Sequence, residues 1–351
     1  MDGDSGQRYH LELPYNQAPY RSLPASLSPF TAAGRTALGS LITSATAINA
    51  GATLPWTCGA GSSSECESFT QLWGTGATVS QASRPYPQYE TINTIDGGGD
   101  RIGHSTYHAL LAKFNRQFGN GLTVQASYTF SKLLDDSDTG YLAASYYGDM
   151  YNLRLLKSIA SYDQTHQVKI SWVYDLPFGK GKPFLGNGVA AAVVGGWRIS
   201  GIQTYASGLP MSIGTNVPSF PIGEFINRAT ISTYKGWTLP YNGKFDPFAD
   251  SYLQPQSFFP AQSSTSFGNA TRYNPSFRSW PQFNETIGLA RVFSIKERAH
   301  LELRGEAFNV LNRTWFGPLG GATTLGNPNW GKWQSQVNSA HQMQLVAKIT
   351  W

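Results

Sequence analysis

Residues 341–351 of this 351-residue chain read HQMQLVAKITW. From Met343 onward every second residue is apolar, and this set comprises Met343, Leu345, Ala347, Ile349 and Trp351. Polar residues take most of the alternate positions, namely Gln342, Gln344, Lys348 and Thr350. Because successive side chains of a β-strand point to opposite faces, the pattern predicts a strand with one apolar and one polar face. A barrel strand between lipid and an aqueous lumen needs this division.

The same alternation recurs along the chain, most clearly at Leu122, Val124 and Ala126. We expect long strands at 105–117, 122–132, 164–176, 197–213, 281–292, 299–310 and 341–351, and a weaker one at 8–15. Transmembrane β-strands need about 9–11 residues, and all but the weak stretch reach that length. The predicted fold is therefore all-β and antiparallel.

The connections between these strands alternate in length. Short ones fall at 119–121, 178–182 and 295–298, and long ones at 133–163, 214–280 and 311–340. If the carboxyl terminus faces the periplasm, every short turn lies there and every long loop lies outside, which is the arrangement of outer-membrane barrels. A soluble β-sandwich is the alternative for such strands, but loops of this length are uncommon in compact soluble domains. We therefore favour a transmembrane β-barrel.

The composition agrees with that interpretation. Charged residues are 13% of the chain, against about 25% in typical soluble domains, while aromatic residues reach 13%. No run of about 18 apolar residues occurs, which excludes a transmembrane helix. The formal net charge is +5, but lysine and arginine are scattered, and this argues against nucleic-acid binding. We expect no nucleic-acid partner.

The two cysteines, Cys58 and Cys66, stand in the glycine- and serine-rich stretch CGAGSSSEC. In an oxidising compartment we expect them to form a small loop disulfide, and two free thiols are the alternative. No histidine or further cysteine at metal-binding spacing lies near them.

Catalytic and metal chemistry find little support in the sequence. The six histidines are dispersed, and no set of nucleophile, base and orienting residue emerges from their spacing. Asp135, Asp136 and Asp138 form an acidic cluster, for which a solvated loop is favoured over calcium binding. We expect no catalytic residue, no metal and no cofactor, and hence no enzyme.

Aromatic residues lie at predicted strand ends and in loops. Because amphipathic rings favour the membrane–water interface, we expect interface positions for Tyr128, Phe130, Trp172, Tyr174 and Trp197. For Trp330 and Trp333, a girdle or packing within a loop is favoured over stacking on a carbohydrate-like ligand.

Several phrases resemble the carboxyl-terminal barrel of TonB-dependent receptors, in particular the Oar-like group. They are GLTVQASYTFSK at 121–132, YDLPFGKGK at 174–182, GGWRISGI at 195–202 and LRGEAFNVLN at 303–312, within a likeness that covers residues 84–351. The resemblance implies a plugged barrel of about 22 strands whose external loops capture a scarce solute. The plug and the energy-coupling segment of such receptors have no counterpart here.

Seven or eight strands are about a third of such a barrel, so we expect a carboxyl-terminal receptor part. Residues 1–104 would hold the weak first strand and a long external loop segment, and residues 105–351 the barrel strands and loops. A self-contained small barrel, an outer-membrane binding or adhesion protein, and a secreted glycan-active protein are the alternatives.

The expected location is the outer membrane of a Gram-negative-type bacterium. The expected partners are outer-membrane lipid, the barrel-insertion machinery acting on the terminal strand 343–351, the rest of the receptor with its plug, and an unidentified solute.

Overall fold

The computed structural model describes residues 18–41, 78–86, 103–136, 151–179, 181–217, 228–240, 245–296 and 299–351. The predicted weak strand at 8–15 and the pair Cys58 and Cys66 lie outside these residues. No described helix is both long enough and apolar enough to span a membrane.

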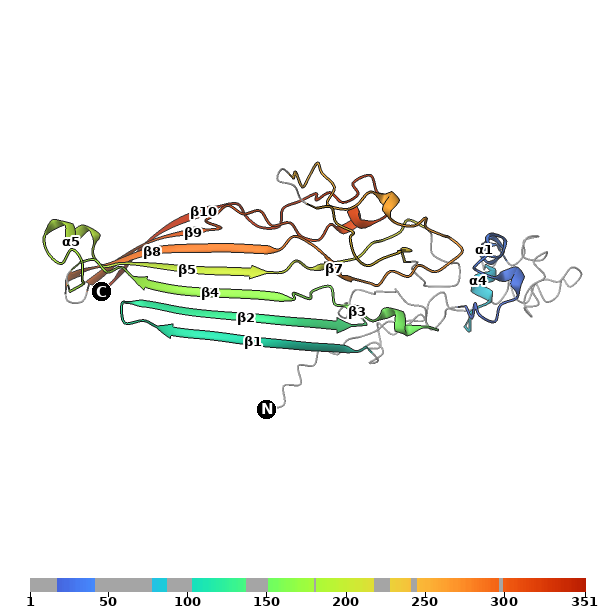
Figure 1. Cartoon of the computed structure of the whole chain (residues 1–351), viewed down its shortest axis with the longest axis horizontal. Coiled ribbons are helices and arrows are strands. Elements are labelled where there is room, and N and C mark those ends of the chain that lie inside the picture. The colour runs from blue at the N-terminus through green and yellow to red at the C-terminus, as the bar shows by residue number, and fades with distance from the viewer. Residues whose placement is uncertain are drawn as a thin grey trace, which may run out of the picture.

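One antiparallel sheet dominates the structure (Figure 1). Its main path consists of β1 (Ser105–Gln117), β2 (Leu122–Asp135), β4 (His166–Asp175), β5 (Trp197–Ala206), β8 (Gln282–Lys296), β9 (Ala299–Phe308) and β10 (Gln342–Thr350). The two-residue strand β3 (Ser158–Ile159) pairs with the end of β2 and completes an eight-stranded sheet. The predicted all-β antiparallel fold is confirmed. All seven long strands coincide with predicted ones, and β1 has the predicted bounds.

β2 and β8 run a few residues beyond their predicted ends at 132 and 292, and two predicted segments are wrong in kind. The stretch 197–213 contains two strands, because β5 ends at Ala206 and β6 (Pro210–Met211) pairs instead with β7 (Asn274–Arg278) in a separate small sheet. Gly208 lies between them, against the backbone of Ser279, where a Cβ would collide. The short link expected at 178–182 is also longer, since α5 (Gly188–Val194) follows it before β5 begins.

The two ends of the sheet differ in their connections (Figure 1). The β1–β2 turn, α5, the adjoining ends of β8 and β9, and the carboxyl terminus lie at one end, which we call the turn end. At the β1–β2 turn, Gly121 adopts a φ of 85°, which glycine reaches without the strain that a Cβ brings. The long connections lie at the opposite end, which we call the loop end.

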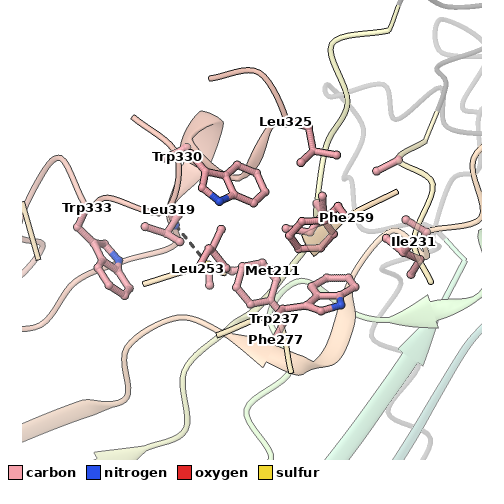
Figure 2. Close-up of a cluster of buried hydrophobic side chains, with 14 of the residues drawn as sticks. Met211, Ile231, Trp237, Leu253, Phe259, Phe277, Leu319, Leu325, Trp330 and Trp333 are labelled. Atoms are coloured by element: carbon pink, nitrogen blue, oxygen red, sulfur yellow. Dashed lines mark hydrogen bonds between the residues drawn. The ribbon is translucent and has the colours of Figure 1, made fainter. Parts of the chain in front are cut away.

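The long connections carry their own buried core. The described parts of residues 207–281 and 309–341, which we call the loop cap, include β6, β7, the 3-10 turns η3 (Gln256–Phe258) and η4 (Gly320–Thr323). Figure 2 shows their buried apolar side chains gathered into one cluster. The cluster consists of Met211, Ile213, Ala229, Ile231, Trp237, Leu253, Phe259, Ala270, Phe277, Phe316, Leu319, Ala322, Leu325, Trp330 and Trp333.

The amino-terminal part forms η1 (Ala25–Leu27), α1 (Ala32–Gly39) and α4 (Val79–Ala82). It touches the loop cap through aromatic rings: the centroids of Tyr20 and Phe30 lie 5.4 and 5.1 Å from that of Phe267. The Arg35 guanidinium also donates a hydrogen bond to the backbone oxygen of Ser264. This segment therefore packs at the loop end of the molecule.

Candidate functional site

The strand register aligns the apolar side chains of neighbouring strands. Val124 lies opposite Trp172, Ile199 opposite Leu289, and Leu303 opposite Ala347. Directly opposed residues of antiparallel strands point to the same side of the sheet. One side, which we call the apolar face, therefore carries Leu110, Ala112, Phe114, Val124, Ala126, Tyr128, Phe130, Val168, Ile170, Trp172, Tyr174, Ile199, Gly201, Ile287, Leu289, Leu301, Leu303, Gly305, Met343, Leu345, Ala347 and Ile349.

Side chains of the apolar face are exposed. Leu345 is 87% exposed, Met343 72% and Leu110 64%. In a β-sandwich such side chains would be sealed against a second sheet, whereas here they form a continuous surface. Contiguous apolar surface of this extent marks contact with a membrane or a partner. The face is suited to hydrocarbon.

Glycines on the apolar face make room for large neighbours. Gly201 lies opposite Trp172, and a Cβ on Gly201 would stand 2.5 Å from the indole ring. The ring therefore lies across the glycine. Gly305 similarly faces Leu345, at 3.3 Å from the position of a Cβ, beside a groove of about 430 Å³. The absence of side chains at these two positions keeps the face closely packed.

The opposite side of the sheet, which we call the polar face, carries most of the charged and amide side chains of the strands. Asp175 pairs with Arg198 across β4 and β5 at 2.7 Å, and Arg304 lies 3.2 Å from Glu306. Gln344 donates a hydrogen bond to the same Glu306. Exposed pairs of this kind contribute about 0–1 kcal/mol each. These charged and amide groups make the polar face compatible with water.

The predicted interface aromatics all lie on the apolar face, in two groups. Trp172, Tyr174 and Trp197 lie toward the turn end, whereas Tyr128 and Phe130 lie toward the loop end. Arg291 joins the first group, 5.7 Å from the centre of the Trp197 ring. His166 joins the second, 2.9 Å from the Tyr128 hydroxyl. The arrangement has the form of two aromatic girdles, and the interface role of these residues stays a prediction.

The terminal strand β10 forms one border of the sheet and pairs with β9. Its apolar residues Met343, Leu345, Ala347 and Ile349 fall on the apolar face, opposite Ala307, Gly305, Leu303 and Leu301. Trp351 follows directly after the strand and is exposed. The expected role of these residues in barrel insertion stays a prediction.

In the loop cap, Trp330 and Trp333 are 7% and 2% exposed. Their indole nitrogens donate to the backbone oxygens of Gln254 and Gly317, both at 2.8 Å. Of the alternatives considered for these two residues, packing within a loop is confirmed. The ligand-stacking alternative is wrong for them, because buried rings present no face to a solute.

Two ion pairs with buried carboxylates link the connection that follows β5 to the end of β2 and to the connection that follows β2. The Arg272 guanidinium bonds the carboxylate of Asp135, and both side chains are almost fully buried. Arg278 pairs with Asp163 at 2.7 Å. The expectation of a solvated loop is therefore wrong for Asp135, which is 1% exposed. Asp138 lies outside the described residues, among which no cluster of three or more metal-ligating side chains occurs.

A third arginine, Arg228, lies close to this junction. Its guanidinium donates to the backbone oxygens of Leu155 and Ala270, at 2.6 and 3.2 Å. Burial, together with the nearby charge of Arg272, lowers the pKa of Arg228 to about 10, so it remains a cation at neutral pH. The sequence does not indicate a role for Arg228, Arg272 or Arg278, because their partners lie far away in the chain and the residues form no local pattern.

Comparison with known proteins agrees with this geometry. The family described as outer membrane beta barrel domain matches residues 3–344, nearly the whole chain. Neither the curated proteins nor the solved structures contain a match. A sheet with an apolar and a polar face, with its long connections at one end, is what such a domain requires in a Gram-negative-type outer membrane. The chain belongs to the outer membrane beta barrel domain family.

Proposed function

We propose that the chain supplies part of the wall and the solute-capturing external loops of a TonB-dependent receptor-like transporter of the Oar-like group. The observation that carries the proposal is the apolar face, which continues across seven long strands while the described parts of the long connections lie at the loop end. The resemblance of the phrases in residues 84–351 to such receptors supports the finer assignment. Uptake of this kind requires neither a catalytic residue nor a resident cofactor.

The direction of the border strands supports a part of a larger barrel. The main path holds seven long strands, each antiparallel to the next, so β1 and β10 run in the same direction. Bacterial barrels close with an even number of antiparallel strands. Antiparallel closure therefore needs an odd number of strands from outside the described residues. Figure 1 shows β1 and β10 at opposite borders of an open sheet, which favours several such strands over a single one.

In this proposal, lipid covers the apolar face and the rest of the receptor, including its plug, borders the polar face. The barrel-insertion machinery engages β10, whose border position and apolar residues suit that step. Movement of an unidentified solute then depends on the plug and on energy from the inner membrane, which the described residues do not supply.

The test is made in a bacterium that carries the complete gene. Residues 214–280 are replaced by a short turn, and uptake of scarce nutrients is compared with the unaltered strain, with and without an uncoupler of the proton-motive force. We expect uptake to fall to background in the altered strain and in uncoupled cells. Uptake that persists in uncoupled cells would show a passive pore and overturn the proposal.

A binding or adhesion protein is the second candidate, because the loop cap has a hydrophobic core of its own and needs no lumen to hold its shape. The same altered strain separates the two. If the loop replacement abolishes attachment of cells to a surface and leaves uptake unchanged, the chain serves adhesion.

A further inference from the structure

A notch interrupts the sheet where β9 ends. Pairing of β8 with β9 begins at Ile287 and Ala307, so residues 282–286 of β8 have no partner in the register of β9. Beyond the register, the amide of Val310 donates a hydrogen bond to the backbone oxygen of Glu285 at 2.9 Å. Asn309 and Asn312 have positive φ angles of 50° and 48°, which turn the chain away from β8. Asparagine tolerates this conformation better than most residues do.

The notch forms a pocket of about 250 Å³ at the loop end. Side chains of the polar face form one wall, among them Gln282, Asn284 and Gln342. Phe308 and Trp315 contribute aromatic surface. Trp315 is only half-buried, in contrast to Trp330 and Trp333. The pocket therefore combines amides with rings that remain accessible.

Two asparagines hold the walls of the pocket in place. Their side-chain amides are engaged in hydrogen bonds within the protein. Asn309 donates to the backbone oxygens of Arg313 and Ser339, at 2.9 and 3.1 Å, and accepts from the amide of Arg313 at 2.8 Å. Asn338 accepts from the amide of Trp315, also at 2.8 Å, and so fixes the position of that ring. No such bond engages the side chains of Gln282, Asn284 or Gln342 within the described part of the chain.

The side chains that line the notch are neutral. No ionisable side chain lines it among the described residues. The nearest cation along the chain, Arg313, lies 5.4 Å from the centre of the Phe283 ring, which also lines the notch, and its charge is compensated by Glu285 at 3.0 Å. A charged ligand would lose its hydration in the notch without gaining an opposite charge.

We propose that the notch binds one ring of a neutral, hydroxyl-rich ligand, namely a sugar unit. Each free amide offers both a donor and an acceptor, which matches a hydroxyl group, and an aromatic ring packs on the apolar side of a sugar ring. Drug-sized ligands occupy about 300–1,000 Å³, so a pocket of this size suits a single ring. The inference rests on the proposed function, in which the polar face borders the lumen, and it names the class of solute.

The test uses the full chain folded in detergent and titrated with methyl glucoside, methyl galactoside and methyl mannoside. Glucose 6-phosphate and galacturonate serve as charged comparators. Binding is measured by calorimetry and by tryptophan fluorescence. We expect at least one neutral glycoside to bind, and both charged sugars to bind at least about tenfold more weakly, which corresponds to about 1.4 kcal/mol.

Variants then locate the site. We expect Trp315→Ala to weaken glycoside binding about tenfold or more, and Gln342→Ala, on the exposed border strand, to weaken it about threefold. Gln334→Ala removes an exposed amide of the same connection outside the notch and should leave binding unchanged. Absence of glycoside binding, or equal binding by all three variants, would overturn the inference.

A separate measurement keeps the two proposals apart. The same variants are fractionated from cells, and their presence in the outer membrane is scored. Correct insertion without glycoside binding refutes only the sugar site. Loss of nutrient uptake in the strain with the replaced loop, together with intact glycoside binding, supports both proposals.

Discussion

Individual residues decide how the loop cap is joined to the sheet. Asp135 ends β2, and its carboxylate is held by Arg272 from a connection far away in the chain. Removing one partner of a buried pair leaves an uncompensated charge, at a cost of about 3–5 kcal/mol. We expect Arg272→Met to lower the free energy of unfolding by that amount, measured by urea titration in micelles.

The control for this prediction is the exposed pair of Arg198 with Asp175. Arg198→Met should change the free energy of unfolding by about 1 kcal/mol at most. The double replacement of Asp135 by Leu and Arg272 by Met should recover most of the lost stability, because neither charge of the pair is then left buried without its partner. Equal effects of the two single replacements would contradict the account given for Asp135.

A second prediction at the residue scale concerns Gly201. A Cβ there would stand 2.5 Å from the Trp172 ring. The Gly201→Ala replacement therefore displaces the indole ring from its position over residue 201. Overpacking of this kind costs about 1–3 kcal/mol. We expect that loss in unfolding experiments, with a shift in tryptophan fluorescence. Gly119→Ala is the matched control, since nothing lies within 4 Å of its Cβ position.

At the scale of elements, alternation of side chains explains why the strands were predictable. Apolar residues such as Val124 and Ala126 recur at every second position, and this pattern can be recognised without knowing which residues make distant contacts. Helix α5 was missed because its apolar run, Gly188–Val194, carries no amphipathic period. The pairing of β6 with β7 was also missed, because it joins residues about 60 positions apart that have no local signal.

The division of the strands into two faces is testable on neighbouring residues. Ala126 lies on the apolar face and Ser127 on the polar face of β2. An arginine facing lipid near the bilayer midplane costs about 2–4 kcal/mol. We expect Ala126→Arg to lower the free energy of unfolding in lipid vesicles by that amount. Ser127→Arg should stay within about 1 kcal/mol, and a reversed order would place lipid on the wrong side of the sheet.

At the scale of the whole molecule, the loop cap is a packed layer with its own core. Phe316 and Leu319 of one connection belong to the same buried cluster as Trp237 and Phe277 of the other. The sequence does not predict this cluster, since the contacts are non-local and the connections show no periodicity. The notch was not foreseen either, because it depends on where β9 stops relative to β8.

Because the connections at 214–280 and 311–340 share one buried core, we expect the loss of one to destabilise the other. When residues 214–280 are replaced by a short turn, we expect the connection at 311–340 to become sensitive to protease in intact cells, since seven of the nine cluster residues outside that connection are gone. The sheet should remain in the membrane fraction. Replacing α5, which lies at the turn end, should leave 311–340 resistant. Resistance after both replacements would show that the two connections do not support each other.

The common direction of β1 and β10 also bears on how such a unit arises and how it can be engineered. Growth by copying hairpins changes the strand count by two, so no number of copied hairpins turns the seven long strands of the described residues into an even total. Two units set head to tail about a pore would meet at parallel seams. A designer seeking a minimal pore from this chain should therefore graft an odd number of strands, three or more, beside Ser105–Gln117.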